Sequence, residues 1–211
     1  MPTRSTSRRQ NGFSLPEALV CLGLLSILLT AIYGLVNLAF RHAKEAEVFE
    51  TVHQQAIVGI HRISRELEIT SAASTAPTGA DYLTFGSPHQ PIGVPNHETY
   101  THDANGNLEW YKWVTFYLDS NSATVYRIET PLPSKSPSPP LTPDQPLITD
   151  LKAITDNRRT VVCRNCIALS FSPGVLTPGT IRVRLETSGQ FRTDKPTTLK
   201  LDTEVLPRNE P

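Results

Sequence analysis

The chain has 211 residues, with 20 basic and 20 acidic side chains. This balance does not favour a nucleic acid or another polyanion as a partner. The roughly 140 residues after position 70 allow one modest globular core but scarcely two.

The N-terminal region combines a basic start with a long uncharged stretch. Arg4, Arg8 and Arg9 come first without any acidic residue, and residues 18–40 contain no Asp, Glu, Lys, Arg or His. At about 1.5 Å per residue, such a helix spans the roughly 30 Å hydrocarbon core of a bilayer. We therefore predict a transmembrane segment at residues 18–40. The positive-inside rule places the N-terminus in the cytoplasm and the C-terminal region across the membrane.

A cleaved secretory signal peptide and a plain signal anchor are the alternatives for this region. A signal peptide has an apolar core of about 7 to 15 residues and a small-residue cleavage site after it. The apolar run here is far longer, and no such site follows it. A plain signal anchor explains the arginines and the span, but it gives no reason for Glu17 at the start of the run.

The sequence pattern of residues 13–70 predicts one long helix. Pro16 suits a first helical turn, because the backbone N–H that proline lacks would have no partner there. After the apolar run, apolar residues recur at steps of three and four, which places them on one helix face. They are Phe49, Val52, Ala56, Gly59, Ile60, Ile63 and Leu67. The second half of the helix is therefore expected to pack against another layer.

The sequence pattern of residues 71–211 predicts a β-rich globular domain. Six segments are rich in β-branched and aromatic residues, as is typical of strands. They are residues 81–85, 109–118, 123–130, 160–171, 179–187 and 198–206. The short polar stretch between the second and third segments predicts an antiparallel hairpin. The expected fold class is α+β, with the long helix packed on an antiparallel β-sheet.

Residues 131–146 form a proline-rich segment with seven prolines. Proline cannot donate a backbone hydrogen bond to a sheet, so we predict an extended, exposed loop within the domain. A polyproline ligand is the alternative, but the predicted location across the membrane from the cytoplasm disfavours it.

The sequence G-F-S-L-P-E-A-L-V, at residues 12–20, leads into the apolar run. An ionised carboxylate in hydrocarbon is costly, so a residue such as Glu17 is usually paired and functional. This N-terminus has a basic leader, a glycine followed by phenylalanine, an acid five places after the glycine, and an uninterrupted apolar span. In this combination it resembles the N-termini of type IV prepilins and type II secretion pseudopilins.

The resemblance implies a processing pathway. In this family a membrane-bound prepilin peptidase cuts after the glycine on the cytoplasmic face and methylates the new N-terminal residue. By position, residues 1–12 would be the leader peptide, cleavage would fall between Gly12 and Phe13, and Phe13 would be methylated. Glu17 would then pair with the Phe13 amine of a neighbouring subunit, in a first helical turn where the helix dipole favours an anion. Alternatively, Glu17 lies among the lipid headgroups and needs no partner.

The resemblance also implies a pilin-like fold and a structural, non-enzymatic role. Residues 113–129 and 203–209, like the chain length, look like those of minor, J-type pseudopilins. The expectation is a single-pass inner-membrane subunit with a periplasmic domain, assembled through its N-terminal helix with other pseudopilins into the pseudopilus of a type II secretion system. The alternatives are a minor pilin that primes a type IV pilus for adhesion, motility or DNA uptake, and a membrane-anchored binding or enzymatic domain.

Cys163 and Cys166 form a C-x-x-C pair. In a regular strand their thiols would point to opposite faces, so a disulfide requires a turn or bulge at residues 164–165. Zinc would need two further ligands, and the sequence offers no second pair at a suitable spacing. A short-range disulfide and free, packed cysteines both stay open.

Asp103, Asn105 and Asn107 carry oxygen-bearing side chains at alternate positions and are weak calcium candidates. The twelve-residue EF-hand loop is missing, and Asn-Gly is a common turn signal, so a turn is favoured. No nucleophile–base pair, phosphate loop or carboxylate pair indicates an enzyme, and no cofactor is expected.

Overall fold

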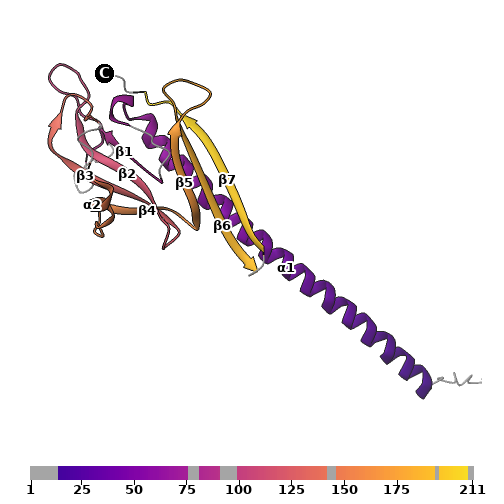
Figure 1. Ribbon diagram of the computed structural model, residues 1–211. Coiled ribbons are helices and arrows are strands. Elements are labelled where there is room, and N and C mark those ends of the chain that lie inside the picture. The colour runs from indigo at the N-terminus through magenta and orange to yellow at the C-terminus, as the bar shows by residue number, and fades with distance from the viewer. Residues whose placement is uncertain (1–13, 76–80, 91–98, 142–145, 193–194, 209–211) are drawn as a thin grey trace, which may run out of the picture. The chain divides into compact units, whose positions relative to one another are not determined.

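The computed structural model describes residues 14–75, 81–90, 99–141, 146–192 and 195–208. Figure 1 shows its elements, which are α1 (Leu15–Glu68), the 3₁₀-helix η1 (Ala72–Ser74), β1 (Tyr82–Ser87), β2 (Trp110–Asp119), β3 (Thr124–Ser136), α2 (Ile148–Lys152), β4 (Arg159–Arg164), β5 (Cys166–Pro173), β6 (Ile181–Arg192) and β7 (Lys195–Val205). The chain divides into two compact units, Met1–Ala46 and Glu47–Pro211.

The described part of the first unit is the N-terminal part of α1. Its large apolar side chains are exposed, Leu15 by 77 % and Ile27 by 69 %. The hydroxyls within the apolar run bond to the helix itself. Ser26 Oγ donates to the Leu22 carbonyl at 2.9 Å, and Thr30 Oγ1 donates to the Ser26 carbonyl at 2.8 Å. By length and composition α1 could cross a membrane, and its own backbone already satisfies these two hydroxyls.

The second unit contains the rest of α1 and two antiparallel sheets. One sheet has the strand order β1-β2-β3-β4 and the other β5-β6-β7. In Figure 1, β5, β6 and β7 run beside α1. The predicted hairpin is confirmed, since β2 and β3 pair antiparallel with Asp119 opposite Thr124. The predicted α+β, pilin-like fold is also confirmed, although two sheets take the place of the single sheet that was expected.

One face of the second part of α1 is buried. Its buried residues are Val52, Ala56, Gly59, Ile63 and Leu67. Two of them form the main core with residues of both sheets, such as Phe116 and Val183. The predicted stripe is wrong at Phe49, which is 51 % exposed and stacks on His53. Val48, four residues before Val52, is half-buried and extends this face instead, because both valines lie against Gly189 of β6.

Residues 160–171 were predicted as one strand, but they belong to two strands in different sheets. Asn165, between β4 and β5, has a φ of 57°, in the left-handed region that asparagine tolerates better than most residues. Hydrogen bonds to both sheets hold this turn. The Cys166 N–H donates to the Ala123 carbonyl and the Ser188 N–H to the Asn165 carbonyl, each at 2.8 Å.

The first part of the proline-rich segment belongs to β3, which corrects the prediction of a loop throughout residues 131–146. Pro131 lies opposite Lys112 of β2. The pairing of β3 with β4 ends at Ile128, so the later part of β3 is an edge, where proline is tolerated. Residues 142–145 lie outside the described ranges.

Candidate functional site

The described chain begins at Ser14, which is bonded to Glu17. The Oε2 atom of Glu17 accepts hydrogen bonds from the Ser14 backbone N–H and from the Ser14 hydroxyl, each at 2.9 Å. The Ala18 N–H donates to the Ser14 carbonyl at 3.1 Å as the helix begins. An acid three residues after the helix cap thus satisfies a backbone N–H that has no partner within the helix.

This contact was not predicted, although Ser-x-x-Glu at residues 14–17 is a capping signature that the sequence displays. It turns the carboxylate of Glu17 back toward the start of the helix. Gly12 and Phe13, the predicted cleavage pair, lie outside the described residues. Cleavage between them, and the pairing of Glu17 with the amine of Phe13, therefore stay predictions.

A buried ionic cluster joins the second part of α1 to the four-stranded sheet. Lys112 Nζ of β2 lies 2.6 Å from Glu129 Oε1 of β3, and Arg127 Nη1 lies 2.6 Å from the same oxygen. Arg127 Nε lies 2.6 Å from Glu66 Oε1 of α1. Lys112 also donates to the Gln90 carbonyl at 2.9 Å. Because two cations meet two anions, the formal charge of the cluster is balanced.

Burial and pairing act against each other on the two cations of this cluster. Burial lowers the pKa of Lys112, because desolvation penalises the ammonium, and the Glu129 carboxylate offsets only part of this effect. Burial also acts to lower the pKa of Arg127, but Glu66 and Glu129 together outweigh it and raise that pKa. The guanidinium therefore stays charged and holds α1 to the sheet through Glu66.

The ionic cluster was missed by the sequence predictions. Its only local signals are a lysine within an apolar run of β2 and a basic and an acidic residue at alternate positions of β3. Glu66 lies 61 residues before Arg127, and no local pattern connects them. Only the packing of α1 on the sheet brings the four side chains together.

Cys163 and Cys166, the C-x-x-C pair, lie side by side at the crossover from β4 to β5. Their Sγ atoms are 2.8 Å apart, and both side chains are buried free thiols. The turn that the sequence required for their contact is the one at Asn165. The S–H···S hydrogen bond from Cys166 lowers the pKa of Cys163, and the same bond, together with burial, raises the pKa of Cys166.

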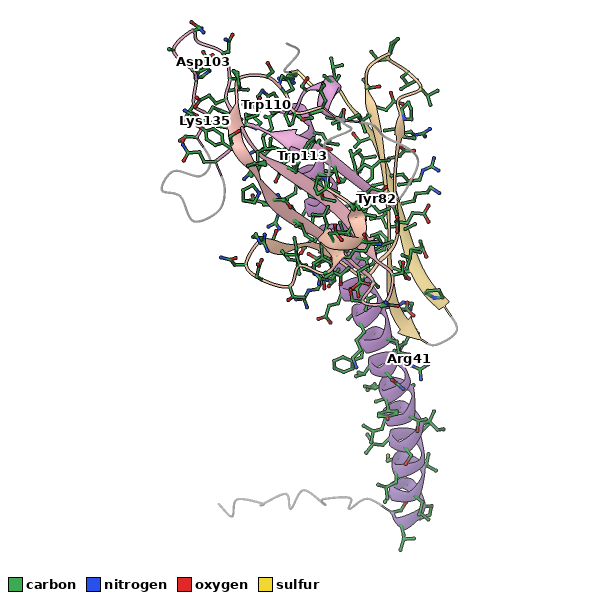
Figure 2. All side chains as sticks on the ribbon, turned by 60° about the vertical axis from the view of Figure 1, so that its left-hand side comes forward. Arg41, Tyr82, Asp103, Trp110, Trp113 and Lys135 are labelled. Carbon is green, nitrogen blue, oxygen red and sulfur yellow. The ribbon has the colours of Figure 1, made fainter. Side chains whose placement is uncertain are left out.

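Asp103, Asn105 and Asn107 build a turn. Asp103 Oδ1 accepts from the backbone N–H groups of Asn105 and Asn107, each at 2.8 Å, and Oδ2 accepts from the Asn107 amide at 3.0 Å. The Asn107 side-chain bond is the main cause that lowers the pKa of Asp103. Gly106 supplies the left-handed position with a φ of 85°. Figure 2 shows Asp103 in this loop, which precedes Trp110 at the start of β2.

The geometry of this loop favours the turn over a calcium site, because both carboxylate oxygens of Asp103 already accept hydrogen bonds. Within the described ranges, no group of three or more His, Cys, Asp or Glu side chains is arranged to hold a metal ion.

Comparison with known families identifies the N-terminal segment. Residues 7–33 match the family model described as the prokaryotic N-terminal methylation motif. Comparisons with curated proteins and with solved structures found no significant match. The matched segment contains Gly12, Phe13 and Glu17 and extends into the exposed apolar part of α1.

Proposed function

We propose that this chain, whose residues 7–33 match the prokaryotic N-terminal methylation motif, is a minor, J-type pseudopilin-like subunit of a type II secretion system. Prepilin peptidase removes residues 1–12 and methylates Phe13. Residues 18–40 hold the mature subunit in the inner membrane, with the C-terminal domain in the periplasm. The subunit then joins other pseudopilins in a periplasmic pseudopilus that serves protein export, without catalysing a reaction itself.

The observation that carries this proposal is the methylation motif at the start of a single 54-residue helix. The first part of this helix exposes large apolar side chains, and the second part buries one face on the sheets. An exposed apolar helix surface needs lipid or other helices around it. In the proposed cycle, lipid surrounds this surface before assembly and neighbouring subunits cover it afterwards.

Glu17 is the residue through which processing controls assembly. Its carboxylate faces the start of the helix, where it accepts two hydrogen bonds from Ser14. Cleavage after Gly12 creates a positively charged amine on Phe13, and methylation leaves that charge in place. The amine of a neighbouring subunit then compensates the Glu17 carboxylate, which hydrocarbon would otherwise disfavour by several kcal/mol. An uncleaved subunit has no such amine.

The sequences of residues 113–129 and 203–209, which look like those of J-type pseudopilins, support a minor subunit. A minor pilin that primes a type IV pilus would use the same processing. Purification of the native complex distinguishes the two, because secretion and pilus machines contain different partner proteins.

Mass spectrometry of the full-length protein from cells with active prepilin peptidase tests the processing step. The expected product begins at N-methylated Phe13. Gly12→Arg should leave the longer precursor in the membrane, because the peptidase no longer meets glycine at its cleavage site. Wild-type protein that keeps Met1 in such cells would overturn the proposal.

Co-purification with neighbouring subunits tests the assembly step. Glu17→Val should still be cleaved after Gly12 but should not co-purify, because the carboxylate serves the assembled partner. Ser14→Ala is the matched control, since it removes the hydroxyl contact to Glu17 and keeps the carboxylate, so it should assemble. If Glu17→Val co-purifies as well as wild type, the pairing of carboxylate and amine is wrong.

A further inference from the structure

The crossover between the two sheets of the second unit is built around two sulfur atoms. Cys163 pairs with Val125 in the four-stranded sheet, and Cys166 pairs with Thr187 in the three-stranded sheet. Both pairings stand next to an irregularity in strand register. The left-handed turn at Asn165 brings the two side chains to the same side of the chain. A regular strand would have separated them.

The two thiols face each other in a buried site. Their Sγ atoms are 2.8 Å apart and lie 3.4 and 3.5 Å from the same carbonyl oxygen, that of Arg164. The side chains are 0 % and 1 % exposed. The helix covers Cys163, because a Cβ added to Gly59 of α1 would lie 2.9 Å from the Cβ of Cys163. Only a small movement separates this arrangement from a covalent bond between the sulfurs.

We propose that Cys163 and Cys166 form an intrachain disulfide that locks the crossover between the two sheets. This inference rests on the proposed function in one respect, namely that the domain lies in an oxidising compartment outside the cytoplasm. It does not depend on which machine the subunit serves.

The oxidant is a disulfide-donor protein of that compartment, and the reaction is thiol–disulfide exchange. The Cys163 thiolate attacks one sulfur of the donor disulfide and releases a donor thiolate. The Cys166 thiolate then attacks the Cys163 sulfur, which forms the intrachain bond and releases the second donor thiolate. The two cysteines lose two protons and two electrons, and the donor becomes a dithiol.

Burial sets the order of events. A donor protein cannot reach two sulfurs that are already buried, so the disulfide forms before Gly59 of α1 closes over Cys163. The closed domain then protects the bond from reductants. The chain segment between the two cysteines is short, so the bond constrains the crossover more than it constrains the whole unfolded chain.

Differential alkylation of full-length wild-type protein tests the inference. Membranes are denatured in N-ethylmaleimide, reduced, and then treated with a heavier maleimide before peptide mass spectrometry. We expect Cys163 and Cys166 to carry the heavy label and Cys21, in the apolar part of α1, to carry the light one. In cells without the disulfide donor, all three should carry the light label. A light label on Cys163 and Cys166 in most wild-type molecules would overturn the disulfide.

The same mass spectra contain the N-terminal peptide, which separates the two proposals. A processed Phe13 with unpaired thiols rejects the disulfide and leaves the proposed function intact. An unprocessed Met1 with an intact disulfide rejects the prepilin pathway and keeps the disulfide.

Protection of the bond is tested with dithiothreitol in mild detergent, with and without denaturant. We expect at least a tenfold slower reduction in the folded protein, because the sulfurs are buried. Equal rates would contradict the order of events inferred from burial. Cys163→Ser, which leaves Cys166 alone, should show no reduction-dependent labelling.

Discussion

The two parts of α1, residues 15–46 and residues 47–68, share one regular backbone and have opposite surroundings. A Cβ added to Gly34 in the first part would meet no atom within 4 Å. A Cβ added to Gly59 in the second part would lie 2.9 Å from the Cβ of Cys163. Residues 18–40 of the first part carry no charged side chain on any face, whereas the second part is apolar only along one stripe. The distribution of apolar residues around a helix therefore reports how many of its sides lie in apolar surroundings.

Among the variants compared here, Glu129→Ala should cause the largest loss of folding stability. It removes the carboxylate that Lys112 and Arg127 share, so a buried ammonium is left without a charged partner, at a cost of about 3 to 5 kcal/mol. Urea unfolding of the full chain in detergent measures the loss. Fluorescence reports on the sheet, because both tryptophans, Trp110 and Trp113, are buried in β2 (Figure 2).

Two further variants control this experiment. Glu45→Ala, in the first part of α1, removes the partner of His42 in an exposed pair and should change stability by at most about 0.5 kcal/mol. The double variant Lys112→Met, Glu129→Leu should lose less folding stability than Glu129→Ala, because it leaves no buried ammonium without a partner. If Glu129→Ala is as stable as Glu45→Ala, the cluster does not hold the helix to the sheet.

Ile63→Ala should cost about 3 kcal/mol, because Ile63 is fully buried in the main core and its loss leaves a cavity. Ile27→Ala makes the same chemical change in the first part of α1, where the side chain is 69 % exposed. It should leave the unfolding of the sheet domain unchanged. The midpoint of thermal unfolding, followed by near-ultraviolet circular dichroism, compares the two. Equal losses would contradict the difference between the two parts of the helix.

Gly59→Ala should cost about 1 to 2 kcal/mol, because the new methyl group meets Cys163 and Leu185 in a packed site. Gly34→Ala should be neutral or slightly stabilising, since alanine is the better helix former and the space is open. Urea midpoints of the two variants give the comparison. A Gly59→Ala protein as stable as wild type would mean that the helix and the crossover are not closely packed.

The smallest effect is expected at Asp103, far from the helix contacts. Its pKa lies below the ordinary 3.8, so its contribution to stability is present above pH 3.8 and is lost as the pH falls through the lowered value. Asp103→Ala should therefore be less stable than wild type at pH 7, and the difference should shrink below pH 3.8. Thermal unfolding across this range measures it.

Asn105→Ala is the matched control in this turn, because Asn105 contacts Asp103 through its backbone N–H, which alanine keeps. Millimolar calcium should raise the unfolding midpoint of neither wild type nor this variant. If calcium raised the unfolding midpoint of wild type and Asp103→Ala abolished this rise, the loop would be a calcium site after all.

The strands show where local pattern suffices and where it fails. The β2–β3 hairpin was predictable, because its alternation and its polar turn lie within a short stretch. The break at Asn165 was not, because the residues around it favour a strand, and the turn is held by hydrogen bonds to the distant residues Ala123 and Ser188. The strand at Pro131 was missed for a similar reason. Whether proline is tolerated depends on whether β3 has a neighbour on both sides there.

The sequence by itself determined the apolar part of α1, the methylation motif and the capping pair of Ser14 and Glu17, because each depends on residues within a few turns of one another. The tertiary structure alone decided that Glu66 meets Arg127 and that Gly59 lies against Cys163. These partners come from distant parts of the chain. Their contact depends on strand pairing and on the packing of the helix against two sheets, which local patterns do not encode.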